Sequence, residues 1–174
     1  SQRPVGIKPL DTAIYLYPTA TPKVTAKPIA AGTKLKNKNA SYQVVSANPK
    51  QPTVTYVQNL KKTAVSVTVP AQVKIGSVTY KVVAIGFKAF ANNKKLKTLT
   101  IGKNITTIGK NAFAGCKKLK KITIKSTKLK SGTIGKNAFK GTAKNLVVKV
   151  PRKQYRAYKK FLKKKGNKKV KIKK

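Results

Sequence analysis

The reactive side chains of this sequence are almost all of one kind, the lysine amine. The chain has 42 Lys and Arg residues, one acidic residue, Asp11, and no histidine, which gives a formal net charge of +41. General acid–base catalysis and the binding of hard metal ions depend on carboxylates or imidazoles. The composition therefore argues against most classes of enzyme, and it favours a partner that is itself an anion.

The remaining nucleophiles lack the neighbours that would activate them. Cys116 is the single cysteine, so it has no partner for an internal disulfide, and a catalytic thiol needs a base that the chain does not supply. No Ser-x-x-Lys or Gly-x-Ser-x-Gly motif is present, and the Gly-Lys pairs do not belong to a phosphate-binding loop motif. We expect no catalytic residue, no metal site and no cofactor.

The bulk composition is that of a folded chain without a membrane span. Hydrophobic residues make up 40% of the sequence, more than a disordered basic tail contains. The longest apolar runs fall far short of the roughly 20 residues that cross a bilayer. Only three of the basic residues are arginines, Arg3, Arg152 and Arg156, and arginine is the residue that reads base edges. Sequence-specific recognition of nucleic acid is therefore not expected.

The first half of the chain predicts an arm followed by strands. Residues 1–31 contain five of the nine prolines, which favours an extended arm or linker, with one short strand at residues 14–17. From Ser41 apolar and polar residues alternate, which predicts strands at 42–46, 53–57 and 65–69. Residues 74–81 predict a hairpin that turns at Gly76 and Ser77. We assign residues 32–80 to a β-strand N-terminal cap.

The second half is a repeat. Six apolar positions between Ile85 and Ile101 recur 23 residues later, and a third copy follows at an offset of 26 residues. A period of this length with Leu-x-x-Leu-x-Ile is typical of leucine-rich repeats, whose coils bury apolar residues against their neighbours. We assign residues 81–150 to these repeats, with ten predicted core residues: Phe90, Leu96, Leu99, Ile101, Phe113, Cys116, Leu119, Ile122, Ile124 and Phe139.

The motif that runs from Leu96 to Cys116 resembles a known family. It reads Leu-x-x-Leu-x-Ile-x-x-x-Ile-x-x-Ile-Gly-x-x-Ala-Phe-x-x-Cys, and this pattern is similar to that of the BspA-like leucine-rich repeats of bacterial surface proteins. The resemblance covers about residues 63–174. It implies that Ala112, Phe113 and Cys116 fill the interior of a coil, and that the protein is a secreted or cell-surface module of a bacterium.

The residues after Pro151 predict a helix and a final strand. Tyr155, Tyr158 and Leu162 have helical spacing, Gly166 follows as a stop signal, and Val170 and Ile172 alternate with lysines. We assign residues 151–174 to a C-terminal cap. The predicted fold class is α+β and mostly β: a short leucine-rich-repeat solenoid with an N-terminal β cap and a C-terminal helix-plus-strand cap.

The lysines of successive repeats fall in register, which predicts a basic face. At the 23-residue offset three lysines of one repeat match three of the next, and adjacent coils stand about 4.8 Å apart. The residues we assign to polyanion binding are Lys94, Lys95, Lys97, Lys117, Lys118, Lys120, Lys121, Lys125, Lys163, Lys164 and Lys165.

These features favour a non-enzymatic module that binds or adheres to anionic polymers, glycans or acidic protein surfaces. Teichoic acid and sulfated or sialylated glycans are partners of this kind. Two alternatives stay open: binding of nucleic acid through its phosphates without sequence readout, and a self-assembling surface subunit in which residues 1–31 pair with the sheet edge of another copy.

Overall fold

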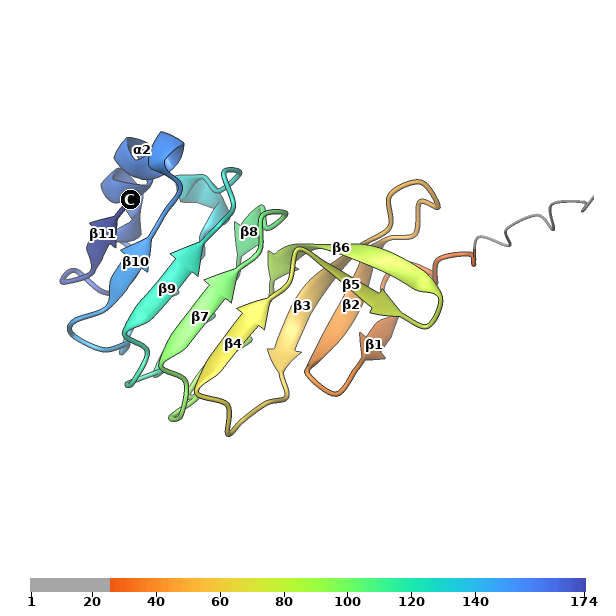
Figure 1. The fold of residues 1–174 in the computed structure, drawn as a ribbon, viewed down its shortest axis with the longest axis horizontal. Helices are drawn as coiled ribbons and strands as arrows, with labels where there is room; N and C mark the ends of the chain where they lie inside the picture. The colour runs from red at the N-terminus through yellow and green to blue at the C-terminus, as the bar shows by residue number, and fades with distance from the viewer. Residues whose placement is uncertain (1–25) are drawn as a thin grey trace, which may run out of the picture.

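The computed structural model describes residues 26–174, and within them the chain is mostly β-strand with a helical segment near the C-terminus (Figure 1). The strand expected at residues 14–17 and most of the predicted arm lie outside the described residues. The strands are β1 (Lys34–Lys36), β2 (Ala40–Ser46), β3 (Thr53–Asn59), β4 (Ser66–Val69), β5 (Gln72–Ile75), β6 (Val78–Ile85), β7 (Thr98–Ile101), β8 (Thr107–Ile108), β9 (Lys121–Ile124), β10 (Val147–Lys149) and β11 (Lys171–Lys173). The helices are η1 (Ser131–Thr133), η2 (Arg152–Gln154) and α2 (Tyr155–Leu162).

One sheet consists of parallel strands contributed by successive turns of the chain. Its order is β11-β10-β9-β7-β4, and Figure 1 shows these strands side by side. The register pairs Leu99 with Ile122, Ile122 with Val148, and Val148 with Ile172. The offsets of 23 and 26 residues seen in the sequence are thus the register of β9 with β7 and of β10 with β9, whereas β11 follows β10 at an offset of 24 residues. We call it the repeat sheet.

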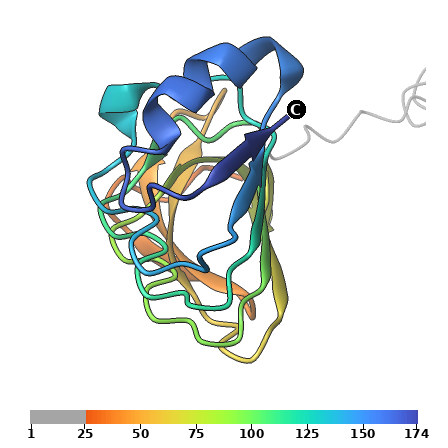
Figure 2. The ribbon, with the colours of Figure 1, turned by 90° about the vertical axis from the view of Figure 1, so that its left-hand side faces the viewer.

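The second sheet is mixed and extends farther toward the N-terminus. Its order is β1-β2-β3-β6-β5, with β8 paired to β6. The β1-β2-β3 pairs and the β5-β6 pair are antiparallel, whereas β3 and β8 run parallel to β6. The β5-β6 hairpin turns at Gly76, whose φ of 63° lies in the left-handed region that favours glycine. Seen from its C-terminal end, the chain winds around with the repeat sheet on one side and short turns on the other (Figure 2).

Backbone hydrogen bonds also link the short turns from one repeat to the next. The amide of Phe90 donates to the carbonyl of Ala112 at 2.8 Å, and the amide of Phe113 donates to the carbonyl of Ala138 at 2.9 Å. The amide of Phe139 donates in the same way to the carbonyl of Lys165 at 2.8 Å. These bonds satisfy polar backbone groups that a turn without regular structure would otherwise leave unpaired.

The core is a stack of one aromatic residue per layer. Tyr42, Tyr56, Phe90, Phe113 and Phe139 follow one another with ring centroids 5.4, 5.3, 5.6 and 5.7 Å apart. All ten residues that the sequence analysis assigned to the core are buried, none with more than 2% of its surface exposed. The stacked aromatic residues and the buried aliphatic residues around them therefore form one continuous apolar column inside the coil.

Asn104, which follows the repeat strand β7, ties its corner to the preceding layer. Its side-chain amide donates to the carbonyl of Ala71 at 2.9 Å. A polar side chain at such a corner satisfies a backbone group that the tight turn would otherwise leave without a partner.

Helix α2 packs on the C-terminal end of the stack through Tyr158 and Leu162, which are both buried. The Tyr158 hydroxyl donates to the carbonyl of Ser126 at 2.8 Å and accepts from the amide of Leu129 at 3.1 Å. This pair of bonds ties the helix to the loop that follows β9.

Candidate functional site

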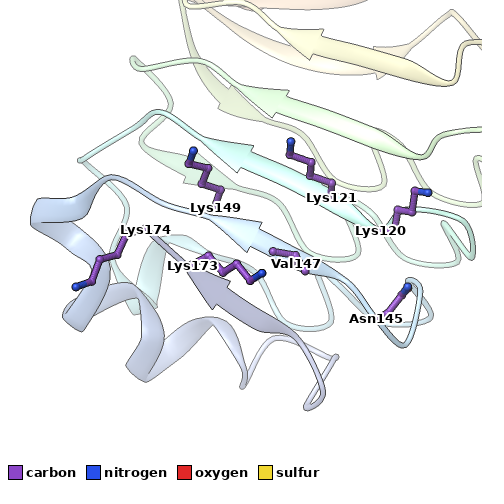
Figure 3. A pocket seen from close by; sticks show the side chains of 7 residues that line it. All are labelled: Lys120, Lys121, Asn145, Val147, Lys149, Lys173 and Lys174. Atoms are coloured by element: carbon purple, nitrogen blue, oxygen red, sulfur yellow. The ribbon is translucent and has the colours of Figure 1, made fainter.

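A shallow depression on the outer face of the repeat sheet is lined mainly by lysines. It has a volume of about 470 Å³ and lies over β9, β10 and β11 (Figure 3). We call it the lysine groove, and its lining residues are Lys120, Lys121, Asn145, Val147, Lys149, Lys173 and Lys174.

The alternation of side chains along the strands puts these lysines on the outside. Along β9 the exposed Lys121 is followed by the buried Ile122, and along β11 the buried Ile172 lies between two exposed lysines. Because successive side chains of a strand point to opposite faces, burying the apolar residues forces the lysines into solvent. The apolar pattern that builds the core thus also builds the groove.

Strand register brings groove residues side by side. Lys149 pairs with Lys173, and Val147 pairs with Lys121 on one side and Lys171 on the other. Val147 is half-buried, so the groove has an apolar floor between cationic walls. Figure 3 shows the lysines that surround this valine.

The groove carries uncompensated positive charge. No residue from 26 to 174 is Asp or Glu, so the described part of the chain offers no side-chain carboxylate to pair with these amines. Two amines about 4.8 Å apart repel by about 0.9 kcal/mol in water before salt screening. An anion that lies between Lys149 and Lys173 is attracted to both amines, and this attraction outweighs their mutual repulsion.

The positive surface continues from the groove onto helix α2. The Lys174 Nζ lies 5.3 Å from the centre of the Tyr155 ring, and the Lys159 Nζ lies 5.6 Å from it, within the range of cation–π attraction. A second depression, of about 490 Å³, is lined by Tyr155, Arg156, Lys159 and Lys160. Lys174 thus connects the groove to the helix surface.

The structure brings together only part of the predicted polyanion-binding set. Lys120 and Lys121 line the groove. The backbone amide of Lys120 donates to the carbonyl of Lys97 at 3.0 Å, so these two lysines are neighbours as the register predicts. The other lysines of this part of the repeats are exposed in the turns that lead into β7 and β9: Lys94, Lys95, Lys117 and Lys118.

Three predicted residues that follow α2, and one that follows β9, lie away from the groove. Lys125 is exposed just after β9, at the opposite end of that strand from Lys121. Lys163 and Lys164 are exposed beyond the helix. Lys165 is half-buried, and its Nζ donates to the carbonyl of Ser131 at 2.9 Å, so its amine already has a protein partner.

Most of the groove was not predicted from the sequence, including Lys149, Lys173 and Lys174. A signal for the first two was present in the sequence. Lys149 lies between Val148 and Val150, and Lys173 follows Ile172. Because side chains alternate along a strand, burial of these apolar residues predicts that both lysines face outward. Lys174 reaches the groove only because β11 pairs with β10, which the sequence does not show.

The Cys116 thiol is poorly placed to act as a nucleophile. It is fully buried, and its thiol donates to the carbonyl of Phe90 at 2.9 Å. Burial raises the pKa of this thiol to about 11, so the reactive thiolate is scarce at neutral pH.

Clusters of metal ligands and membrane-spanning helices are both absent from the described residues. Residues 26–174 contain no group of three or more His, Cys, Asp or Glu side chains placed to hold a metal ion. Among the helices of that region, none has the length and apolar character needed to cross a membrane.

Comparisons with known proteins agree on the type of repeat. The chain is similar to the crystal structure of a leucine-rich cell surface protein from Faecalibacterium prausnitzii A2-165, with a TM-score of 0.54 and 25% identity over 71% of this chain and 38% of the other. It is also similar to a leucine-rich repeat protein from Bacteroides capillosus ATCC 29799, with a TM-score of 0.56 and 17% identity over 81% of this chain and 99% of the other. The chain thus spans well under half of the first of these proteins. A comparison with the curated proteins found no match.

The family comparison covers most of the chain. Residues 68–174 match the model of the BspA type leucine rich repeat region, in six copies. The matched residues include the end of β4, the other four strands of the repeat sheet, the lysine groove and helix α2. The protein belongs to the family of BspA type leucine-rich repeats.

Proposed function

We propose that this protein is a non-enzymatic binding module of a secreted or cell-surface bacterial protein, and that its lysine groove binds anionic polymers such as teichoic acids or sulfated or sialylated glycans. The observation that carries the proposal is the groove itself. Lysines from three neighbouring strands surround a half-buried valine, and no described residue offers a side-chain carboxylate.

The chemistry of the groove fits a repeating anion better than a single small ligand. The groove is shallow, and its positive charge continues past Lys174 to Tyr155 and the outer surface of α2. Lysine amines are hydrated point charges that attract phosphate, sulfate and carboxylate groups without fixing their orientation. A polymer with an anionic group on each unit contacts several lysines at once, and this multiplies weak contacts into useful affinity.

In this proposal the segments at the two ends of the repeat shield its apolar core from water. Strands β1 to β3 lie at the N-terminal end and α2 with β11 at the C-terminal end of the stack. An open repeat needs end segments with a polar outer face, because each coil otherwise leaves one apolar face in water. The exposed lysines of β1 and α2 meet that need.

The test neutralises the groove while keeping the fold. The triple variant Lys121→Gln, Lys149→Gln, Lys173→Gln removes three exposed charges from one face. A matched control, Lys110→Gln, Lys136→Gln, Lys140→Gln, removes three exposed charges from the turns on the other side of the coil. A lysine near an anionic surface contributes about 1 kcal/mol to binding, so the groove variant is expected to lose about 100-fold in affinity.

Affinities for teichoic acid, heparin and duplex DNA are measured by titration across a range of salt concentrations. The proposal expects the groove variant to lose affinity for teichoic acid or heparin at least ten times more than the control variant does. Equal losses in the two variants would show that binding follows net charge alone and would refute a groove. Tighter binding to DNA than to either wall polymer or glycan at matched salt would favour the nucleic-acid alternative instead.

A further inference from the structure

The outer face of the repeat sheet carries two rows of side chains that run across the strands. Along each strand of this sheet the buried residues alternate with exposed or half-buried ones, which therefore face outward. The register places the outward residues of neighbouring strands side by side. One row is Ser66, Thr98, Lys121, Val147 and Lys171, and the other is Thr68, Thr100, Thr123, Lys149 and Lys173.

The chemistry of both rows changes from one end of the sheet to the other. On β10 and β11 three of the four outward residues are lysines, whereas on β4 and β7 all four are Ser or Thr. Strand β9, which lies between them, carries one of each kind. We call the five outward hydroxyl side chains the hydroxyl patch: Ser66, Thr68, Thr98, Thr100 and Thr123. The lysine groove therefore borders an uncharged polar surface on the same face.

The hydroxyls of this patch are free to bind a ligand. Thr106 and Thr142, which lie elsewhere in the repeats, use their hydroxyls to donate to the carbonyls of Val83 and Phe139. Within residues 26–174 no hydroxyl of the patch has a partner of this kind, and all five side chains are exposed or half-buried. A hydroxyl both donates and accepts hydrogen bonds, so it suits a ligand that is itself rich in hydroxyls.

The lysine groove also contains two side chains that a purely ionic site does not need. Asn145 and Val147 lie among its lysines (Figure 3). The exposed Asn145 amide can donate to and accept from a hydroxyl. The half-buried Val147 offers an apolar contact, which fits the C–H groups on the face of a sugar ring. Amide, apolar and cationic groups together match a charged sugar better than a bare phosphate.

The dimensions of the two rows indicate a polymer that crosses the strands. Neighbouring strands lie about 4.8 Å apart, so the rows extend about 19 Å from β4 to β11. This length exceeds that of a single sugar. A polysaccharide chain that follows the rows places its anionic groups on the lysines of β9 to β11 and its hydroxyls on the patch.

We infer that the ligand of the lysine groove is an acidic polysaccharide that runs across the strands, held by the groove through its anionic groups and by the hydroxyl patch through its free hydroxyls. The inference rests on the proposed function, to which it adds the class of polymer and the part of the sheet that selects it.

The test removes hydroxyls without changing charge. The triple variant Thr98→Val, Thr100→Val, Thr123→Val keeps the shape of each side chain and uses a residue that favours strands. The matched control is Thr53→Val, Thr55→Val, Thr79→Val, which removes three exposed or half-buried hydroxyls from the second sheet. The probes are an oligomer of sialic acid, which has one carboxylate and several hydroxyls on each unit, and inorganic polyphosphate of matched charge, which has no hydroxyls along its chain.

Binding of both probes is measured by calorimetric titration at one salt concentration. The inference expects the patch variant to lose at least about ten-fold in affinity for oligosialic acid and less than about two-fold for polyphosphate. The control variant is expected to bind both probes as the wild type does. Unchanged affinity of the patch variant for oligosialic acid, or an equal loss for the two probes, would overturn the inference. Binding of polyphosphate but not of oligosialic acid by the wild type would overturn it as well.

The groove variant Lys121→Gln, Lys149→Gln, Lys173→Gln separates the failure of this inference from the failure of the proposed function. It is expected to lose affinity for both probes, because each depends on the lysines. If the groove variant binds both probes as the wild type does, the proposed function fails and the inference fails with it. If the groove variant loses affinity and the patch variant does not, the groove stands and only the selection of a polysaccharide is wrong.

Discussion

Substituting Gly109 by alanine tests how tightly the layers of the repeat are packed. An added Cβ at this position would lie 2.6 Å from the Gly86 carbonyl carbon and from the Phe87 nitrogen. Ordinary contact for such a carbon begins near 3.4 Å, so the two layers must separate by about 0.8 Å. The contacting atoms are backbone, so a change of side-chain rotamer cannot relieve the clash.

The expected cost follows from the bond that this movement breaks. The amide of Gly109 donates to the carbonyl of Ile85 at 2.7 Å, and a separation of 0.8 Å stretches this distance to about 3.5 Å, where little of the bond remains. Losing one such bond and overpacking the layer each cost about 1–2 kcal/mol. We expect Gly109→Ala to lower the free energy of unfolding by about 2–4 kcal/mol.

Urea denaturation at pH 7, followed by circular dichroism, measures this change. The matched control is Gly132→Ala, because an added Cβ there has no heavy atom within 4 Å. The control is expected to stay within about 0.5 kcal/mol of the wild type or to gain slightly from the reduced freedom of its unfolded chain. If Gly109→Ala matches Gly132→Ala, the close approach of the layers does not limit stability and the reasoning is wrong.

Three further predictions concern buried polar groups. Cys116 is expected to react with a thiol reagent at neutral pH only as fast as the protein unfolds, because burial raises its pKa to about 11; rapid labelling of the native protein would contradict this. Tyr158→Phe leaves the Ser126 carbonyl and the Leu129 amide without their partner, so urea denaturation should show a loss of about 1–3 kcal/mol, and a loss below 0.5 kcal/mol would refute the role of the hydroxyl. Burial raises the pKa of Tyr42 from 10.0 to about 12, so its unfolded form ionises first as the pH rises. Its contribution is complete below pH 10 and is lost between pH 10 and 12, by up to about 3 kcal/mol. Tyr42→Phe should flatten that part of the stability profile, and an identical profile in both proteins would contradict the assignment.

Much of the fold was predictable because it depends on local periodicity. The 23- and 26-residue offsets became the register of β9 with β7 and of β10 with β9, and the apolar positions matched across the repeats became the buried column. The helix near the C-terminus followed from the spacing of Tyr155, Tyr158 and Leu162. A repeat residue packs against the matching residue of the next layer. The spacing of apolar residues in the sequence therefore predicts which residues are neighbours in the structure.

The candidate site was less predictable, because it depends on which strands meet across the end of the sheet. Lys120 was identified from its match to Lys97 at the 23-residue offset, whereas Lys173 lies on a strand that pairs with β10 at an offset of 24 residues, which was not predicted. Lys165 was assigned to the anion-binding set from its position in a lysine run, yet its amine donates to the Ser131 carbonyl. A contact such as that of Lys165 with Ser131, which lies 34 positions away, leaves no local signal in the sequence.

The sequence by itself determined the chemical character of this protein: 42 lysines and arginines against one acidic residue and no histidine, and a repeat with an apolar interior. These properties follow from residue types and from alternation within each strand. Tertiary structure alone decided where the charge concentrates and which strands end the repeat sheet. The pairing of β11 with β10 assembles the lysine groove, and among the described residues β4 is the last strand of the repeat sheet on its N-terminal side. Both depend on which layer comes last, and a repeat pattern, being the same in every layer, does not specify its own ends.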